Sequence, residues 1–217
     1  MQVCSCPAAT ALTTIPAVSC AENFGQIQKV AFERLKKADG TKNSFTTGSS
    51  TGIDKLAAWT AKMAKTDGEK VVISPYIQAP SAEPGDPITF GGGNDTLGGV
   101  EIVIGRNATP FTGVMRSVPQ SVIKAMKALQ CEAQADNLGV FLFDENGAIA
   151  AIEDGTTAGT YYPIPIRSLF ISDKGFGGLE TPDSNNIQWA FPPNYSDQLK
   201  IVVPTDFNPL TDLVPAT

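Results

Sequence analysis

The second half of the chain is a succession of short strand-like segments, and this pattern constrains the fold more than any other feature. Apolar residues fill Val140–Phe143 and Ala148–Ile152, on both sides of the turn sequence Asp144-Glu145-Asn146-Gly147. Two short apolar runs around such a turn are typical of an antiparallel β-hairpin. The sequence therefore predicts a hairpin over residues 140–152.

Other segments of the same kind lie before and after this hairpin. They are residues 71–78, 88–90, 100–104, 161–166, 168–171, 187–191 and 199–203. Pro75 restricts the first of them to an edge or bulged position, because proline cannot donate a ladder hydrogen bond. We expect 187–191 and 199–203 to form a last strand pair, joined through Pro192-Pro193-Asn194-Tyr195.

Helical patterns are fewer. Residues 119–134 give the clearest one, with Pro119 in the first turn. The apolar face of this segment consists of Val122, Ile123, Met126, Leu129 and Ala133. Residues 24–37 and 53–65 also show helical spacing, and Glu33 and Lys37 would form a supporting pair four residues apart.

These patterns together predict an α+β fold. We expect a mainly antiparallel β-sandwich or barrel of about seven to eight strands, a flanking helix at 119–134, and one or two N-terminal helices. The length of 217 residues fits a single domain over 22–203. An uncharged extended arm over 1–21 precedes this domain, and a proline-containing tail over 204–217 follows it.

The N-terminal arm has neither the basic start nor the unbroken apolar core of a signal peptide, so we expect an intracellular product. No stretch of the chain approaches the ~20 apolar residues of a transmembrane helix. We therefore expect no membrane partner.

Charge is divided unevenly along the chain. Residues 1–70 contain nine basic and six acidic residues, a net charge of +3, whereas residues 71–217 contain seven basic and sixteen acidic residues, a net charge of −9. A basic front and an acidic remainder suit head-to-tail self-association. Chance division of a mildly acidic surface is the alternative.

The residue types limit the chemistry that is available. Histidine is absent, which excludes imidazole-based triads and histidine-ligated metal sites. Cysteine occurs only as Cys4, Cys6, Cys20 and Cys131, without a fourth nearby ligand for a zinc knuckle. We therefore expect no catalytic residues, no cofactor and no metal site, and we do not expect an enzyme.

The glycine-rich stretch 91–99 is the most conspicuous motif. It contains no lysine and leads into a strand, whereas a phosphate-binding loop needs Gly-Lys-Ser/Thr before a helix. We expect a flexible or subunit-contacting loop instead. The candidate contact residues are Gly91, Gly92, Gly93, Asn94, Gly98 and Gly99.

Several stretches in one order resemble a known family. They are Asn23–Val30, Phe32–Leu35, Val71–Tyr76, Gly92–Asn94, Trp189–Phe191, Asn194–Asp197 and Asp206–Leu213. This order resembles virion structural proteins of tailed bacteriophages that infect Bacteroidetes-type hosts. Within that group the chain is most similar to a major tail, or tail tube, protein.

The resemblance implies a sandwich or barrel flanked by a helix, six copies of which form a ring. The inner strands of the ring would join into one barrel, rings would stack through loops and a terminal arm, and DNA would pass through the lumen during ejection. A conduit must not bind its cargo, so an acidic or neutral wall is suitable. The candidate lumen or inter-ring residues are Glu101, Asp144, Glu145, Glu153 and Asp154.

Two other classes of function are compatible with the same sequence. A capsid-decorating, head-completion or connector protein would share the composition but bind a different lattice. A binding module or a histidine-free enzyme would need a pocket with perturbed acids. The expected partners are further copies of the chain, other virion proteins, and DNA that passes without specific binding, and the expected location is the virion.

Overall fold

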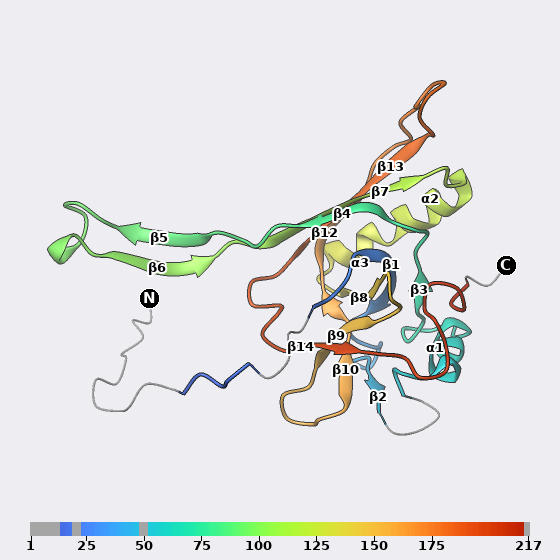
Figure 1. Cartoon of the computed structure of the whole chain (residues 1–217), viewed down its shortest axis with the longest axis horizontal. Helices are drawn as coiled ribbons and strands as arrows, with labels where there is room; N and C mark the ends of the chain where they lie inside the picture. Colours follow the sequence, from blue (N-terminus) through green and yellow to red (C-terminus); the bar gives the residue numbers. More distant parts are fainter. Residues whose placement is uncertain (1–13, 19–22, 48–51, 215–217) are drawn as a thin grey trace.

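The larger of two packed sheets is built around the hairpin that the sequence predicts at 140–152 (Figure 1). The computed structural model describes residues 14–18, 23–47 and 52–214. The path of the larger sheet consists of β2 (Phe45–Thr46), β10 (Thr160–Tyr162), β9 (Ile149–Glu153), β8 (Leu138–Asp144), β1 (Ile27–Arg34) and β3 (Val72–Ile73). Two further strands join it, β11 (Ile164–Pro165) on β8 and β14 (Leu199–Val202) on β9.

The strand β1 corrects the helix predicted over 24–37. It is an interior strand between β8 and the edge strand β3, an apolar cluster packs on each of its faces, and residues 29–33 are buried without interruption. Such a strand lacks the alternation that would identify it, and its partners override the helical propensity of its residues. The predicted pair of Glu33 and Lys37 is absent, because Glu33 pairs with Lys62 and Lys37 pairs with Glu69.

The smaller sheet has four antiparallel strands. In order across the sheet they are β12 (Arg167–Ile171), β13 (Ser184–Phe191), β7 (Thr109–Arg116) and β4 (Gln78–Ala82). The predicted pairing of 187–191 with 199–203 is wrong, because β13 pairs with β7 and β12, whereas β14 crosses to β9 in the larger sheet. The segment 192–195 therefore connects the two sheets.

The two sheets pack face to face around one apolar cluster, which makes the body a β-sandwich. Phe32 of β1 meets Trp189 of β13 edge to face, with ring centroids 6.3 Å apart. Trp189 in turn stacks on Phe111 of β7 at 3.9 Å. The predicted fold class is confirmed, although the described residues contain fourteen strands rather than seven or eight.

Helices close the side of the sandwich and cover the outer face of the larger sheet. The predicted helix at 119–134 is present as α2 (Gln120–Ala128) and α3 (Gln130–Gln134), which meet at Leu129 and pack beside β12. The helix predicted at 53–65 is α1 (Leu56–Met63). Its Trp59 forms a second apolar cluster with Phe45 and Phe141, and the C-terminal Leu210 and Leu213 complete that cluster.

The two terminal segments predicted from the sequence lie partly outside the described residues. Most of the predicted arm over 1–21 lies there, including Cys4, Cys6 and Cys20. Its described part, residues 14–18, has no regular secondary structure, and Ile15 and Val18 are 90% and 87% exposed. In the predicted tail over 204–217, residues up to 214 are described and pack on the body through Leu210 and Leu213.

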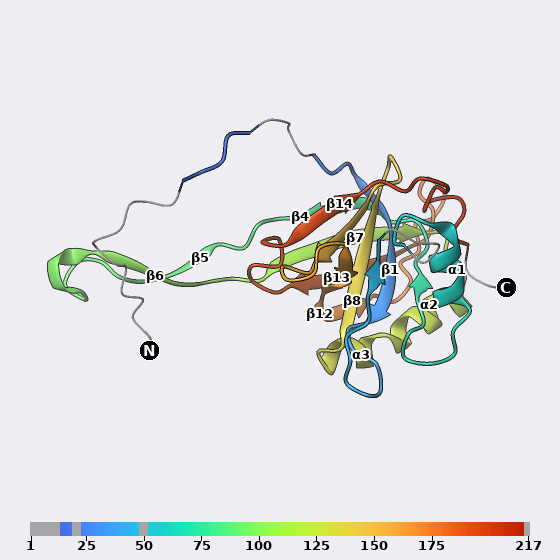
Figure 2. The same ribbon diagram turned by 90° about the horizontal axis from the view of Figure 1, so that it is seen from below.

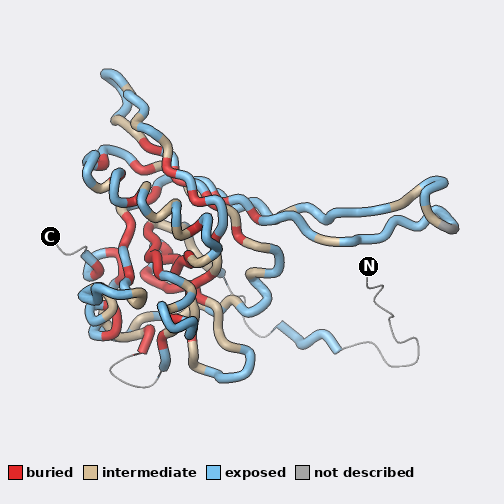
Figure 3. Tube along the Cα trace, turned by 180° about the vertical axis from the view of Figure 1, so that it is seen from behind, coloured by how far each residue is buried: buried red, intermediate tan, exposed pale blue. Residues whose placement is uncertain are grey.

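A two-stranded arm projects from the body as an extension of the β4–β7 pair (Figures 1 and 2). Its strands are β5 (Pro87–Gly91) and β6 (Glu101–Arg106), and a short 3₁₀ helix (Leu97–Gly99) lies at its tip. Figure 3 shows almost the whole arm as exposed backbone, in contrast to the buried strands of the sandwich. The arm extends farther from the sandwich than any other described segment.

Candidate assembly surface

The arm presents apolar side chains to solvent. Phe90 of β5 pairs directly with Ile102 of β6, so the two side chains lie on the same face of the hairpin. The pairing shifts register between Ile88 and Thr89, but the extra residue lies on β6, so the alternation along β5 places Ile88 on this face too. The exposed fraction of the apolar arm residues runs from 41% for Ile88 to 61% for Val103. We call Ile88, Phe90 and Ile102 the apolar arm face.

The glycine-rich stretch forms the tip of the arm. The candidate contact residues of the sequence analysis, Gly91, Gly92, Gly93, Asn94, Gly98 and Gly99, all lie there. Gly91 has a φ of +100°, and a Cβ at this position would lie 2.3 Å from Cγ2 of Thr96. Only glycine fits this reversal. The Thr96 hydroxyl donates to the Val100 carbonyl at 2.6 Å and so closes the tip.

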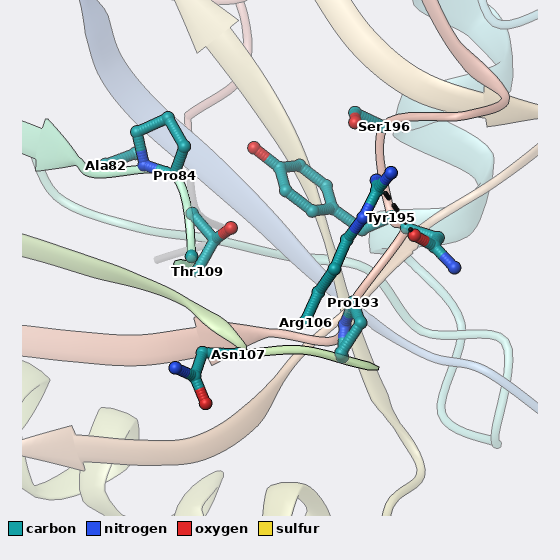
Figure 4. A pocket seen from close by; sticks show the side chains of 10 residues that line it. Ala82, Pro84, Arg106, Asn107, Thr109, Pro193, Tyr195 and Ser196 are labelled. Atoms are coloured by element: carbon teal, nitrogen blue, oxygen red, sulfur yellow. Dashed lines mark hydrogen bonds between the residues drawn. The ribbon is translucent and has the colours of Figure 1, made fainter. Parts of the chain in front are cut away.

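The base of the arm is fixed to the body beside a pocket of about 200 Å³ (Figure 4). A Cβ at Gly85 would lie 2.1 Å from the Asn107 carbonyl oxygen, so only glycine allows the two strand segments at the base of the arm to approach this closely. Arg106 donates from Nη1 to Oδ1 of Asn194 at 3.2 Å. These contacts give the arm a defined direction relative to the sandwich.

Tyr195 forms the inner wall of this pocket. Its ring stacks on Phe191 with centroids 4.5 Å apart, and burial raises the pKa of its hydroxyl. Figure 4 shows the Arg106 side chain reaching toward Tyr195 and Ser196 from the arm. The pocket joins arm and body, and its lining contains one charged side chain, Arg106.

A second, smaller loop also exposes apolar side chains. It connects β12 to β13 at the top of Figure 1 and is tied at its neck by hydrogen bonds between Gly175 and Ser184. Phe176 and Leu179 lie in this loop and are almost fully exposed. The sandwich therefore has two projections with apolar side chains, of which the arm is the larger.

The acidic candidates of the sequence analysis do not form one surface. Glu101 is exposed on the arm, Glu145 is exposed in the β8–β9 turn, Glu153 is the last residue of β9, and Asp154 follows it. Asp144 is only 2% exposed. Its carboxylate accepts hydrogen bonds from the backbone N–H groups of Gly25, Asn146 and Ala148, so its role in the single chain is to organise this turn.

The outer face of the four-stranded sheet is uncharged along its middle, with polar side chains beside Val114 and the exposed Phe170. The register places Thr112 opposite Gln188 and Val114 opposite Asn186. Gln78 and Ser81 of β4 continue the same rows. None of the four strands contains an aspartate or a glutamate. The sequence analysis did not identify this face, because neutral residues carry no charge signal.

One ion pair is buried beneath α1. Nζ of Lys62 lies 2.5 Å from Oε1 of Glu33, whose side chain is fully buried, while the second oxygen of Glu33 has no hydrogen-bond partner. Burial raises the pKa of Glu33 to about 7, against the opposing effect of Lys62. Burial likewise lowers the pKa of Lys62. The pair links α1 to the middle of the larger sheet.

Among the described residues, no group of three or more cysteine, aspartate or glutamate side chains is arranged to hold a metal ion. No helix in the same ranges is long and apolar enough to cross a membrane. Cys131 is exposed and has no disulfide partner there.

Comparisons with known proteins complete the description of the surface. No protein-family model and no curated protein matches the chain. A chain in the tail of an empty GTA particle with C6 symmetry is 11% identical, with a TM-score of 0.33 over 58% of this chain and 82% of that chain. A chain in the six-fold symmetrised baseplate of the anti-feeding prophage is 9% identical, with a TM-score of 0.34 over 88% of this chain and 98% of that chain. Both TM-scores lie below 0.5, so neither likeness establishes a shared fold.

Proposed function

We propose that this chain is a structural protein of a virion that assembles with copies of itself, and that its specific form is the tail tube of a tailed phage. In this proposal six copies form a ring, rings stack into a tube, and DNA passes through the lumen during ejection. The chain has no catalytic role. The observation that carries the proposal is the apolar arm face, which no other part of the described chain covers.

The arm supports assembly because it is unfavourable in isolation. β5 and β6 pair only with each other, and a two-stranded hairpin is marginally stable in water without packing. Contiguous exposed apolar side chains on a soluble protein mark an interaction site. A second copy that covers Phe90 and Ile102 would remove this apolar area from water and order the arm.

The four-stranded sheet supports ring closure. Its outermost strands, β12 and β4, each pair with one neighbour, and an unpaired strand edge invites pairing with another chain. Closed cyclic symmetry removes such edges. The middle of the outer face of this sheet, between the exposed Arg116 at the end of β7 and Arg167 at the start of β12, would then line the lumen, in place of the five acidic positions proposed from the sequence. DNA binds basic surfaces through counterion release, so a wall of Thr112, Asn186 and Gln188 would let it pass.

Sedimentation velocity over rising protein concentration tests the proposal. Phe90→Asp places a charge on the apolar arm face, whereas Thr89→Asp places the same charge on the opposite face of the same strand. We expect the wild type and Thr89→Asp to associate, and Phe90→Asp to weaken association by about tenfold or more, because a charge in an apolar contact is desolvated without a partner.

Each outcome separates a specific alternative. Equal association of Phe90→Asp and the wild type would contradict the role of the arm. Trimers or single closed rings that never stack would favour a capsid-decorating, head-completion or connector protein over a tail tube.

A further inference from the structure

An apolar groove of about 490 Å³ lies on the body between the edge strand β3 and the helix α2. Val72 and Ile73 of β3 form one wall, and Val122 and Ala125 of α2 form the other together with Leu129, which follows α2. β3 pairs only with β1, so it forms the edge of its sheet beside this groove. Val72 is 37% exposed, and Ala125 is exposed as well.

The groove and the arm lie at opposite ends of the molecule. Figures 1 and 2 show the arm tip at one end and α2 at the other, and the base contacts of Gly85 and Arg106 hold the arm in that direction. The arm of one copy therefore does not cover the groove of the same copy. In the described part of the chain, the arm is the larger of two uncovered apolar projections, and the groove offers it an uncovered apolar surface.

Charge adds to this complementarity. Residues 83–106 contain four acidic side chains and one basic side chain, and the basic one, Arg106, is bound to Asn194. Lys70 lines the groove, and α2 contains Lys124, Lys127 and no acidic residue; Lys127 pairs with Asp173, which leaves Lys70 and Lys124 as the positive charges beside the groove. Within the described ranges Lys70 forms no ion pair. An acidic arm is therefore attracted to this groove and repelled by the acidic surfaces elsewhere.

We infer that the groove between β3 and α2 receives the apolar arm face of a second copy of this chain. The inference rests on the proposed function, since it names the surface on which the arm docks. The contact is heterologous: the arm of each copy enters the groove of the next copy and leaves its own groove for a third. Contacts of this kind generate closed rings or open stacks, depending on the rotation between copies.

Cross-linking from the arm tests where it docks. A photoreactive benzophenone amino acid replaces Phe90 in the full chain, and isotope-labelled and unlabelled copies are mixed so that links between two copies are recognised by mass. We expect links from position 90 to peptides that contain Val72 or Ala125 of the other copy. Links to another part of the second copy would overturn the groove as the docking site and leave self-association standing. A chain that forms no links between copies and sediments as a monomer would overturn both proposals.

A matched pair of variants on α2 tests the groove independently. Ala125→Glu places a charge in the groove, and Ala128→Glu places the same charge on the same helix outside the groove lining. Both positions are exposed, so both variants are expected to fold. We expect Ala125→Glu to weaken self-association by about tenfold or more and Ala128→Glu to leave it within about twofold. Equal effects of the two variants would contradict the inference.

Discussion

Asp144 shows how one buried carboxylate fixes a turn at the residue scale. Its Oδ1 accepts from the N–H groups of Asn146 at 3.0 Å and Ala148 at 2.7 Å, and its Oδ2 accepts from Gly25 at 3.1 Å. These bonds join the β8–β9 turn to the segment that leads into β1. The sequence marks Asp144 only as part of an acidic turn, because nothing in its neighbours along the chain reveals that Gly25 reaches it.

Removal of this carboxylate is expected to be costly. Asp144→Ala leaves buried backbone donors without an acceptor, so we expect the free energy of unfolding to fall by about 2–3 kcal/mol. Glu145→Ala changes an exposed side chain of the same turn and is expected to stay within about 0.5 kcal/mol of the wild type. Urea denaturation of the three proteins measures both values. Similar losses for the two variants would contradict the role given to Asp144.

Glu33 adds a pH dependence at the same scale. Burial raises its folded-state pKa from 4.5 to about 7, so the folded chain holds a proton that the unfolded chain releases. The stability that comes from this proton is fully present below about pH 4.5 and is lost as the pH rises through about 7. By linkage, the loss amounts to at most about 3 kcal/mol.

Glu33→Gln isolates this effect, because glutamine does not titrate. We expect the unfolding free energy of the wild type, measured relative to Glu33→Gln by urea denaturation, to decrease between about pH 4.5 and about pH 8. Glu69→Gln serves as the control, since hydrogen bonds from Lys37 and Lys65 lower the pKa of Glu69 and place its titration below this range. Parallel pH profiles for wild type and Glu33→Gln would refute the assignment.

At the scale of elements, local signals predicted what local forces determine. The predictions of the β8–β9 hairpin and of the 119–134 helix were correct, because a turn sequence specifies the hairpin and an apolar stripe specifies the helix. The prediction of a helix at the position of β1 was wrong, because burial on both faces removes the alternation of polar and apolar residues that identifies a strand. The predicted partner strand of residues 187–191 was wrong, because strand pairing depends on residues far along the chain. The strand that pairs here is β7 and not β14, which follows in the sequence.

The arm is the element whose role the sequence only half revealed. Its strands and its glycine-rich tip were predicted, but an apolar segment such as 100–104 is read as core unless its neighbours are known. In the structure none of the residues 87–106 belongs to either apolar cluster of the body. The arm is therefore an addition to a sandwich that is complete without it.

Excision of the arm tests that independence. Pro87 and Arg106 are paired in register, so an Asn-Gly turn in place of residues 88–105 joins them as a short hairpin. We expect this variant to fold with an unfolding free energy within about 1 kcal/mol of the wild type, by urea denaturation, because no core contact is removed. A large loss of stability, or a chain without native circular dichroism, would show instead that the arm belongs to the folding unit.

At the scale of the whole molecule, the uneven charge of the sequence acquires a direction. The groove end carries Lys70 and Lys124, and the arm end carries the acidic residues of 83–106. This polarity suits head-to-tail association of identical copies. The face of each strand was not predictable from the sequence, because a shift of one residue in register exchanges the two faces of a strand.

Electron microscopy of the purified full chain over rising concentration tests the central claim most directly. The account predicts rings with a central hole that stack into tubes, and it predicts that Phe90→Asp prevents their formation. Particles that remain monomeric at every concentration, so that the arm of one copy contacts no other copy, would contradict it.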